Sequence, residues 1–164
     1  MISDNKNQND IINSELLKSY EIEYSFSDKP QKRVKIKPKV ENKTELLKNL
    51  HDKISKIEDC ELKSNASKLV FSDGNLNSHI MLVGEGPGQK EDEIGKPFVG
   101  DAGLLLNKML NAINIDRKNI YITNVVNYRP PNNRKPESSE ITRYSNFLRE
   151  HISIINPKLL ILMG

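Results

Sequence analysis

Residue types that do chemistry on a ligand gather first in "GEGPGQKEDE", residues 84–93, directly after a short apolar run. Glycines let a backbone approach a ligand closely, and carboxylates such as Glu85 and Glu91 stabilise positive charge that develops in a reaction. The segment lacks the Gly-Lys-Ser/Thr ending of a P-loop, and Gln89 stands where a dinucleotide fingerprint needs its third glycine. The pattern favours a site for chemistry over a triphosphate cradle, with helix capping by the acids as the alternative.

A second loop, "NYRPPNNRKP" at residues 127–136, is basic and stiff. Its prolines restrict the backbone before any ligand arrives, which lowers the entropy lost on binding. Its side chains include types that contact nucleic-acid phosphates, namely Arg129, Asn133, Arg134 and Lys135. A stiff connection before a helix is the alternative interpretation. Asn124, shortly before this loop, lies near a predicted strand end, where its amide can reach the same pocket.

Alternating apolar segments position both loops. Strands are predicted at 79–84, 119–126 and 157–164, and amphipathic helices at 101–113 and 136–155. Strand–helix–strand–helix–strand is typical of an α/β fold, a parallel sheet covered by helices. Ligands of such sheets bind beyond the carboxyl ends of the strands, and both loops follow a strand. Three core strands leave the sheet partly uncovered, so we expect a chain that is C-terminally truncated relative to a larger domain.

The helix at 101–113 is expected to use Asp101 as its N-cap. Its apolar residues available for packing are Leu105, Leu106, Met109, Leu110 and Ile113. Upstream, apolar spacing predicts a helix at 44–57 with Thr44 as the N-cap, and "KLVFSDG" at 68–74 indicates a short strand.

Residues 1–43 hold clustered lysines and two prolines in "DKPQKRVKIKPKVENK", with little to bury. We expect a flexible basic tail there, followed by one domain at 44–164. The tail is either a weak electrostatic tether to DNA or a solvated segment.

The composition permits several partners and excludes others. The 164 residues carry a net charge of +3, which is compatible with nucleic-acid binding without requiring it. The single cysteine, Cys60, excludes an internal disulfide. The N-terminus lacks the features of a signal peptide, and no apolar run approaches the ~18 residues that span a bilayer. We expect a monomer of the cytoplasm with no membrane contact.

Three segments in this order resemble the family 4 uracil-DNA glycosylases of bacteria and archaea: "GEGPGQKEDEIGKPFVGDAGLLLNKML", "YITNVVNYRPPNNRKP" and "PKLLILMG". The similarity covers residues 54–164. It implies the uracil-DNA glycosylase fold, with a parallel sheet between helices in three αβα layers. It also implies hydrolysis of the N-glycosidic bond of deoxyuridine, leaving an abasic site in base excision repair. The implied partner is uracil-containing DNA, single or double stranded, with the base flipped out, in a bacterial cytoplasm.

The same resemblance implies roles for five residues. Glu85 matches the catalytic position, orienting the attacking water and stabilising charge on the sugar. Phe98 matches the ring that stacks on uracil, and Asn124 the amide that pairs with uracil O4 and N3–H, a pattern that cytosine reverses. Gly86 matches the backbone beside the base. Glu91 matches an acidic position that shapes the pocket near C5, where a thymine methyl would clash. The alternatives are a core aromatic for Phe98 and a strand-end cap for Asn124.

Two departures from the family stand out. The four cysteines that hold a [4Fe–4S] cluster in most members correspond to Ile57, Cys60, Tyr128 and Tyr144. One thiolate cannot form a four-cysteine site, so we expect no cofactor and no metal, with the tyrosines filling the space. The family's later histidine-containing loop, which donates to uracil O2, has no match, because none of the three histidines lies in that context.

Two other classes of protein remain compatible with the sequence. One is a DNA- or uracil-binding module that kept the pocket and lost catalysis. The other is a nucleotide-binding α/β protein that uses "GEGPG" for phosphate. Cleavage of a uracil-containing oligonucleotide after alkali treatment separates the enzyme from both.

Overall fold

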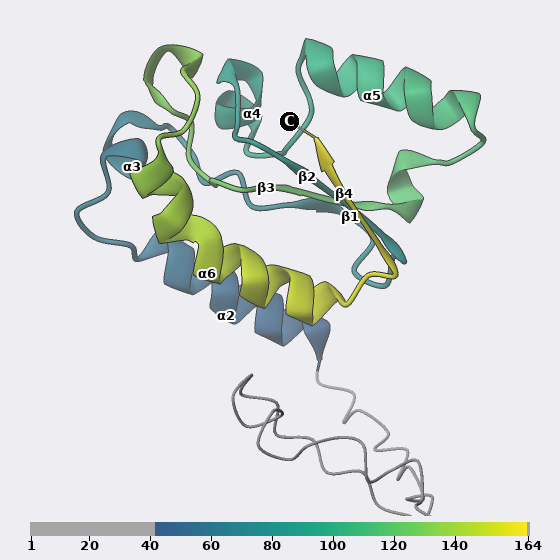
Figure 1. Cartoon of the computed structure of the whole chain (residues 1–164), viewed down its shortest axis with the longest axis horizontal. Helices are drawn as coiled ribbons and strands as arrows, with labels where there is room; N and C mark the ends of the chain where they lie inside the picture. Colours follow the sequence, from purple (N-terminus) through teal and green to yellow (C-terminus); the bar gives the residue numbers. More distant parts are fainter. Residues whose placement is uncertain (1–41, 164) are drawn as a thin grey trace, which may run out of the picture. The chain divides into compact units, whose positions relative to one another are not determined.

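A computed structural model describes residues 42–163 (Figure 1). The expected tail therefore lies outside the described residues, except for Asn42 and Lys43. Asn42 is the N-cap of the first described helix. The Lys43 ammonium donates to the carbonyls of Leu76 (3.2 Å) and Ile155 (2.8 Å), which ties the start of that helix to the rest of the domain.

The described part is an alternation of helices and strands. Its helices are α2 (Lys43–Ser55), α3 (Glu61–Asn65), α4 (Gln89–Ile94), α5 (Asp101–Ala112) and α6 (Ser138–Ile155), with 3₁₀ turns η2 (Arg117–Asn119) and η3 (Pro131–Asn133). Its strands are β1 (Asp73–Gly74), β2 (Ile80–Gly84), β3 (Tyr121–Asn124) and β4 (Leu159–Met163). The short helices α3 and α4 were not predicted, since five or six residues carry too little periodicity to recognise.

The sheet has the order β1-β3-β2-β4. β2 lies at the centre of the three predicted strands and pairs in parallel with both β3 and β4. This confirms the predicted parallel core. The strand expected at 68–74 is reduced to β1, which pairs antiparallel with β3. Before β1, Val70 instead exchanges hydrogen bonds with the backbone and side chain of Asn127.

Helices cover the two faces of the sheet, α5 on one and α2 with α6 on the other (Figure 1). Successive strand residues point to opposite faces, and β2 shows this clearly. Met81 and Val83 are buried with side chains from α2 and α6, whereas Leu82 is buried with side chains from α5. Each such burial contributes roughly 1.5–3 kcal/mol. The expected three-layer αβα fold is confirmed.

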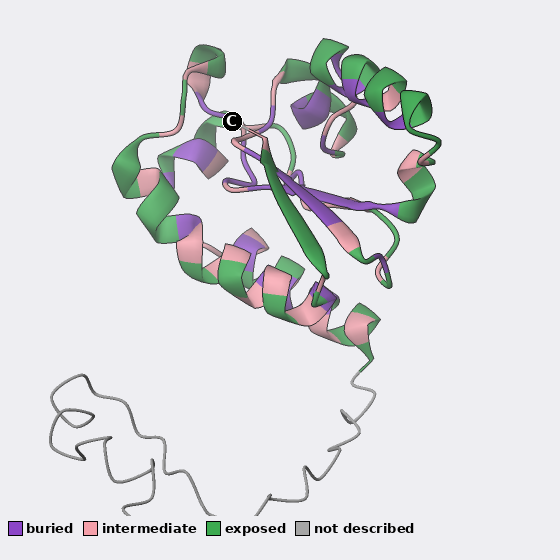
Figure 2. Ribbon diagram, turned by 45° about the vertical axis from the view of Figure 1, so that its right-hand side comes forward, coloured by how far each residue is buried: buried purple, intermediate pink, exposed green. Residues whose placement is uncertain are grey.

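Helix α5 packs more narrowly than expected. Leu106 and Leu110, one turn apart, are buried against the sheet, but Leu105, Met109 and Ile113 are 59%, 55% and 64% exposed (Figure 2). Of the five apolar residues available for packing, two are buried, because only a stripe at i and i+4 reaches the sheet. The N-cap of α5 is Gly100, so the prediction of Asp101 is wrong by one residue. The N-cap of α2 is Asn42, two residues before the predicted Thr44. Despite such apolar surface, no helix among residues 42–163 could cross a membrane.

His151 makes the stability of this domain depend on pH. It is 2% exposed on α6 and hydrogen-bonds to the Tyr121 hydroxyl at 2.7 Å. Burial lowers the pKa of His151 from 6.5 to about 4. Between these two pH values the histidine is therefore protonated in the unfolded chain and neutral in the folded chain. The free energy of unfolding should therefore fall by about 2–3 kcal/mol as the pH drops from about 7 to about 4.5.

Urea unfolding at these two pH values measures the effect. His151→Gln should remove most of this histidine-dependent slope, although it also lowers stability at neutral pH. The exposed His79 provides the control, because His79→Gln should leave the slope unchanged. Equal slopes for wild type and His151→Gln would contradict the prediction.

Candidate functional site

The candidate site lies at the carboxyl ends of β2 and β3. Gly84 and Asn124 are register partners at the last position of the two strands. β3 and β4 lie on either side of β2, and the intervening helices α5 and α6 run over opposite faces of the sheet (Figure 1). In open α/β sheets, ligands bind beyond the carboxyl ends of strands at such a point, where the connections of neighbouring strands run to opposite faces.

Gly84 is the point where two predicted site residues meet. A Cβ at Gly84 would lie 2.4 Å from Asn124 Oδ1 and 2.7 Å from Cε2 of the Phe98 ring. The amide and the ring thus pack together against the Gly84 backbone, which is possible only because Gly84 has no side chain. Gly84 was not predicted as a site residue, because its only signal in the sequence is a glycine at the end of an apolar strand.

Asn124 differs from its neighbour Asn127 in what its amide does. Both are 3% exposed. The Asn127 amide donates to the Val70 carbonyl at 3.1 Å and joins two segments of backbone. No hydrogen bond between residues 42–163 engages the Asn124 amide, which lies beside the Phe98 ring. Since no buried side-chain N or O atom among the described residues lacks a partner, the amide atoms of Asn124 stay open to solvent, and they are therefore available to a ligand.

Phe98 is held in a backbone conformation that an aromatic residue rarely adopts. Its φ is 53°, in the left-handed region. Such a conformation costs about 1–3 kcal/mol and persists only where the surrounding structure imposes it. Gly103 of α5 contributes, because a Cβ there would lie 1.9 Å from the Phe98 carbonyl oxygen. Only glycine lets the first turn of α5 approach this backbone so closely.

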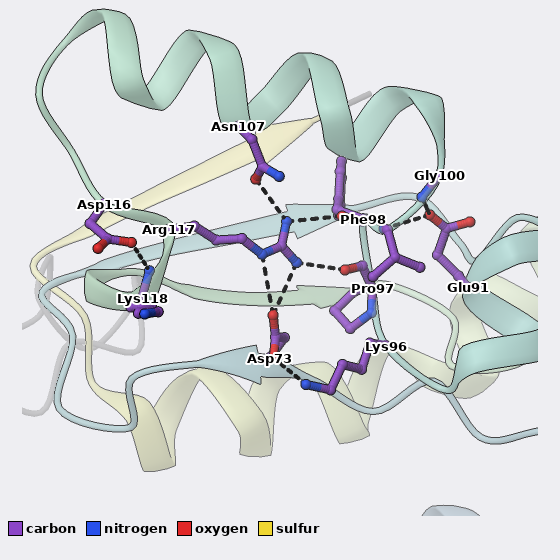
Figure 3. Close-up of polar contacts among 11 residues, drawn as sticks. Asp73, Glu91, Lys96, Pro97, Phe98, Gly100, Asn107, Asp116, Arg117 and Lys118 are labelled. Atoms are coloured by element: carbon purple, nitrogen blue, oxygen red, sulfur yellow. Dashed lines mark hydrogen bonds and ion pairs between the residues drawn. The ribbon is translucent and has the colours of Figure 1, made fainter.

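Glu91 holds the same segment from the side of α4. Its Oε1 accepts from the backbone N–H groups of Val99 (2.8 Å) and Gly100 (2.7 Å), close to Phe98 (Figure 3). Its Oε2 accepts from the backbone N–H of Gly88 at 3.2 Å. Both carboxylate oxygens are thus occupied by backbone amides. Glu91 shapes the site by fixing the segment that carries Phe98, rather than by presenting an unpaired carboxylate.

Glu85 and Gly86 lead from β2 to the second loop. Glu85 is half-buried, and none of the ion pairs between described residues involves it. A Cβ at Gly86 would lie 2.9 Å from Val126 Cγ2 and within 4 Å of Pro130 and Pro136. Gly86 therefore packs against the second loop, and the two loops that the sequence analysis singled out lie together.

The basic residues of the second loop divide into two groups. Arg134 donates two hydrogen bonds to the carboxylate of Glu140, at 2.8 and 2.7 Å, and this contact holds the pKa of Glu140 below its usual value. Arg129 is half-buried and donates to Asn133 Oδ1 at 2.7 Å. Asn133 and Lys135 are exposed. Arg134 thus ties the loop to α6, and the others present polar groups toward solvent.

The four positions that match the cluster ligands come together in the structure. Cys60, Tyr128 and Tyr144 belong to one buried cluster, and Ile57 packs against it. Cys60 Sγ lies 3.4 Å from the Tyr144 hydroxyl, whose pKa is raised by burial, so the phenol stays protonated. One thiol, two phenols and an aliphatic side chain do not fit a four-thiolate cluster. Residues 42–163 contain no group of three or more His, Cys, Asp or Glu side chains that could hold a metal.

The fold and the site define an α/β protein in which an aromatic ring and an amide meet at the carboxyl ends of β2 and β3, with a half-buried glutamate next along the chain. The chain belongs to the uracil DNA glycosylase superfamily, whose family model matches residues 71–164. The resemblance seen in the sequence is confirmed.

Two relatives show how far the similarity extends. Over 120 residues the chain is 43% identical to the type-4 uracil-DNA glycosylase of Thermotoga maritima, covering 73% of this chain and 62% of that protein. It is 42% identical over 119 residues to the type-4 uracil-DNA glycosylase of Sulfurisphaera tokodaii, covering 72% and 54%. The chain therefore spans between half and two thirds of the length of these curated relatives.

Proposed function

We propose that this protein is a uracil-DNA glycosylase, which hydrolyses the N-glycosidic bond of deoxyuridine in DNA and leaves an abasic site for base excision repair. The observation that carries the proposal is the Asn124 amide, nearly buried, unengaged within residues 42–163 and beside the Phe98 ring at Gly84. The two relatives described above are both type-4 uracil-DNA glycosylases, which supports the same activity.

Recognition of uracil follows from these two side chains. The Phe98 ring stacks on the flipped base, which contributes about 1–3 kcal/mol and is tolerant of sequence. The Asn124 amide adds specificity, because it accepts from uracil N3–H and donates to O4, whereas cytosine offers the reverse pattern at these atoms. The Gly86 backbone lies beside the base, and Glu91 keeps the Phe98 segment in place.

Bond cleavage is assigned to Glu85. When the bond between sugar C1′ and base N1 breaks, its electron pair leaves with the base and positive charge develops on the sugar. A carboxylate at that position stabilises this charge and orients the water whose hydroxyl adds to C1′. The proton released by the water balances the charge on the departing base.

Binding of the DNA backbone is assigned to the second loop. Arg129, Asn133 and Lys135 contact phosphates, while Arg134, already bound to Glu140, keeps the loop in register with α6. Because phosphate contacts release counterions, uracil-DNA binding should weaken as salt is raised.

A strand-cleavage assay tests the function. Single- and double-stranded oligonucleotides with one uracil are incubated with the protein and then treated with alkali, with thymine and cytosine oligonucleotides as controls. Strand breaks only at uracil support the proposal. Binding that prefers uracil DNA without breaks would instead identify a non-catalytic module, and tight ATP binding without DNA binding would identify a nucleotide-binding protein.

We also propose that the protein works without an iron–sulfur cluster, since Cys60 supplies the single thiol at the matching positions. Protein purified without oxygen should contain neither iron nor acid-labile sulfide in stoichiometric amounts. The iron content of the Tyr144→Phe variant should equal that of the wild-type protein within the scatter of repeated measurements. Stoichiometric iron together with sulfide would contradict this.

A further inference from the structure

Arg117, in η2 between α5 and β3, binds the backbone of the segment that carries Phe98. Its side chain is 19% exposed and donates to four residues (Figure 3). Nη1 donates to the Phe98 carbonyl at 2.9 Å and to Asn107 Oδ1 at 3.3 Å. Nη2 donates to the Pro97 carbonyl at 2.8 Å and to Asp73 Oδ2 at 3.1 Å. Nε also donates to Asp73 Oδ2, at 3.2 Å. The guanidinium thus joins β1, α5 and the Phe98 segment at one point.

The segment at 97–100 is held by two charged side chains that bind opposite kinds of backbone group. Arg117 donates to the carbonyls of Pro97 and Phe98. Glu91 accepts from the next two N–H groups along the chain. A residue at positive φ persists only where its surroundings over-determine it, and these contacts impose the Phe98 conformation from both sides.

The geometry of the contact requires an arginine. Its planar fork offers five N–H donors at fixed angles, so it can reach two consecutive carbonyls and a carboxylate at once. A lysine ammonium at the same place is a compact point charge on a flexible stem and cannot satisfy all of these acceptors. Asp73 is paired with Arg117 on the side away from Phe98, which aligns the fork.

We propose that Arg117 is a positioning residue for base recognition: it fixes the Phe98 backbone so that the ring lies beside the Asn124 amide at Gly84. The part of this proposal that concerns recognition of a base rests on the proposed function. The contact between Arg117 and the Phe98 segment does not, and it can be tested without any activity.

Fluorine NMR tests the position of the ring directly. The chain has four phenylalanines, so a fluorophenylalanine-labelled protein gives few signals, and Phe98→Leu assigns one of them. In Arg117→Lys the Phe98 signal should shift or broaden, while the signals of Phe71 and Phe147, on the other side of the sheet, report an intact fold. The matched control is Arg149→Lys, at an exposed arginine of α6, which should leave the Phe98 signal in place.

Kinetics on uracil-containing DNA supply the second readout. Arg117→Lys should lower kcat/KM by about 10- to 100-fold, mainly through a higher KM, because a misplaced ring weakens binding of the base. A folded Arg117→Lys protein with an unchanged Phe98 signal overturns the proposal. A displaced signal with unchanged KM overturns it as well, since the ring position would then not matter for recognition.

Two further outcomes are distinguishable. If wild-type protein shows no preference for uracil DNA, the proposed function fails and the ligand part of this proposal falls with it, while the NMR comparison still decides whether Arg117 holds Phe98. If Arg117→Lys does not fold, Asn107→Ala removes one partner of the guanidinium and should shift the same Phe98 signal by a smaller amount. No shift in Asn107→Ala would then overturn the proposal.

Discussion

Asn124→Asp is expected to lower kcat/KM for uracil excision by roughly 100-fold or more. The aspartate keeps the shape of the side chain but replaces the NH₂ group with an oxygen, so uracil O4 loses its donor and faces a carboxylate. An unpaired polar group in a closed site costs about 1–3 kcal/mol, and more when a charge is involved. Single-turnover cleavage of a uracil oligonucleotide measures the loss.

The control for this variant is the same asparagine-to-aspartate substitution at a position far from the site. Asn146 is exposed on α6, and Asn146→Asp adds an identical charge without touching the site. It should retain the wild-type rate of excision. Undiminished uracil excision by Asn124→Asp would remove Asn124 from the recognition site, and with it the observation on which the proposed function depends.

Gly84→Ala is expected to abolish recognition while leaving most of the fold in place. The added methyl would lie 2.4 Å from Asn124 Oδ1 and 2.7 Å from the Phe98 ring, both too close for any real contact. These neighbours are side chains rather than backbone, so they move aside and the strand pairing survives. Displacing both of the groups that we propose contact the base should cost at least as much in kcat/KM as changing Asn124 alone, roughly 100-fold or more.

A double-mutant cycle with Phe98→Ala separates this mechanism from general destabilisation. If the methyl clashes with the ring, removing the ring should restore part of the free energy of unfolding lost in Gly84→Ala. Coupling of about 0.5–3 kcal/mol is typical of residues in contact. Excision should remain absent in the double variant, because the stacking ring is gone. Additive effects on unfolding would show that the methyl and the ring do not meet.

Local pattern was sufficient for the elements that carry the site. The strands that became β2, β3 and β4 and the helices α5 and α6 were predicted, with ends that differ by at most two residues. Periodicity identifies such elements because it reflects which face of a helix or strand can be buried. It could not show that Leu105 and Met109 stay exposed, since burial depends on what packs across an element. It also could not show that α4 forms, since one and a half turns leave little periodic signal.

What the sequence determined by itself was the inventory: a glycine-rich acidic loop, a basic proline-rich loop, an amide at a strand end and a single cysteine. These are properties of residue type and spacing, and motif order was enough to indicate the family. Only the tertiary structure decided which of these groups meet. It brought Asn124 and Phe98 together at Gly84, turned Glu91 and Arg134 toward partners within the protein, and placed Arg117 on the Phe98 backbone. Such contacts join residues distant in sequence, and their partners follow from strand register and helix packing, which no local pattern encodes.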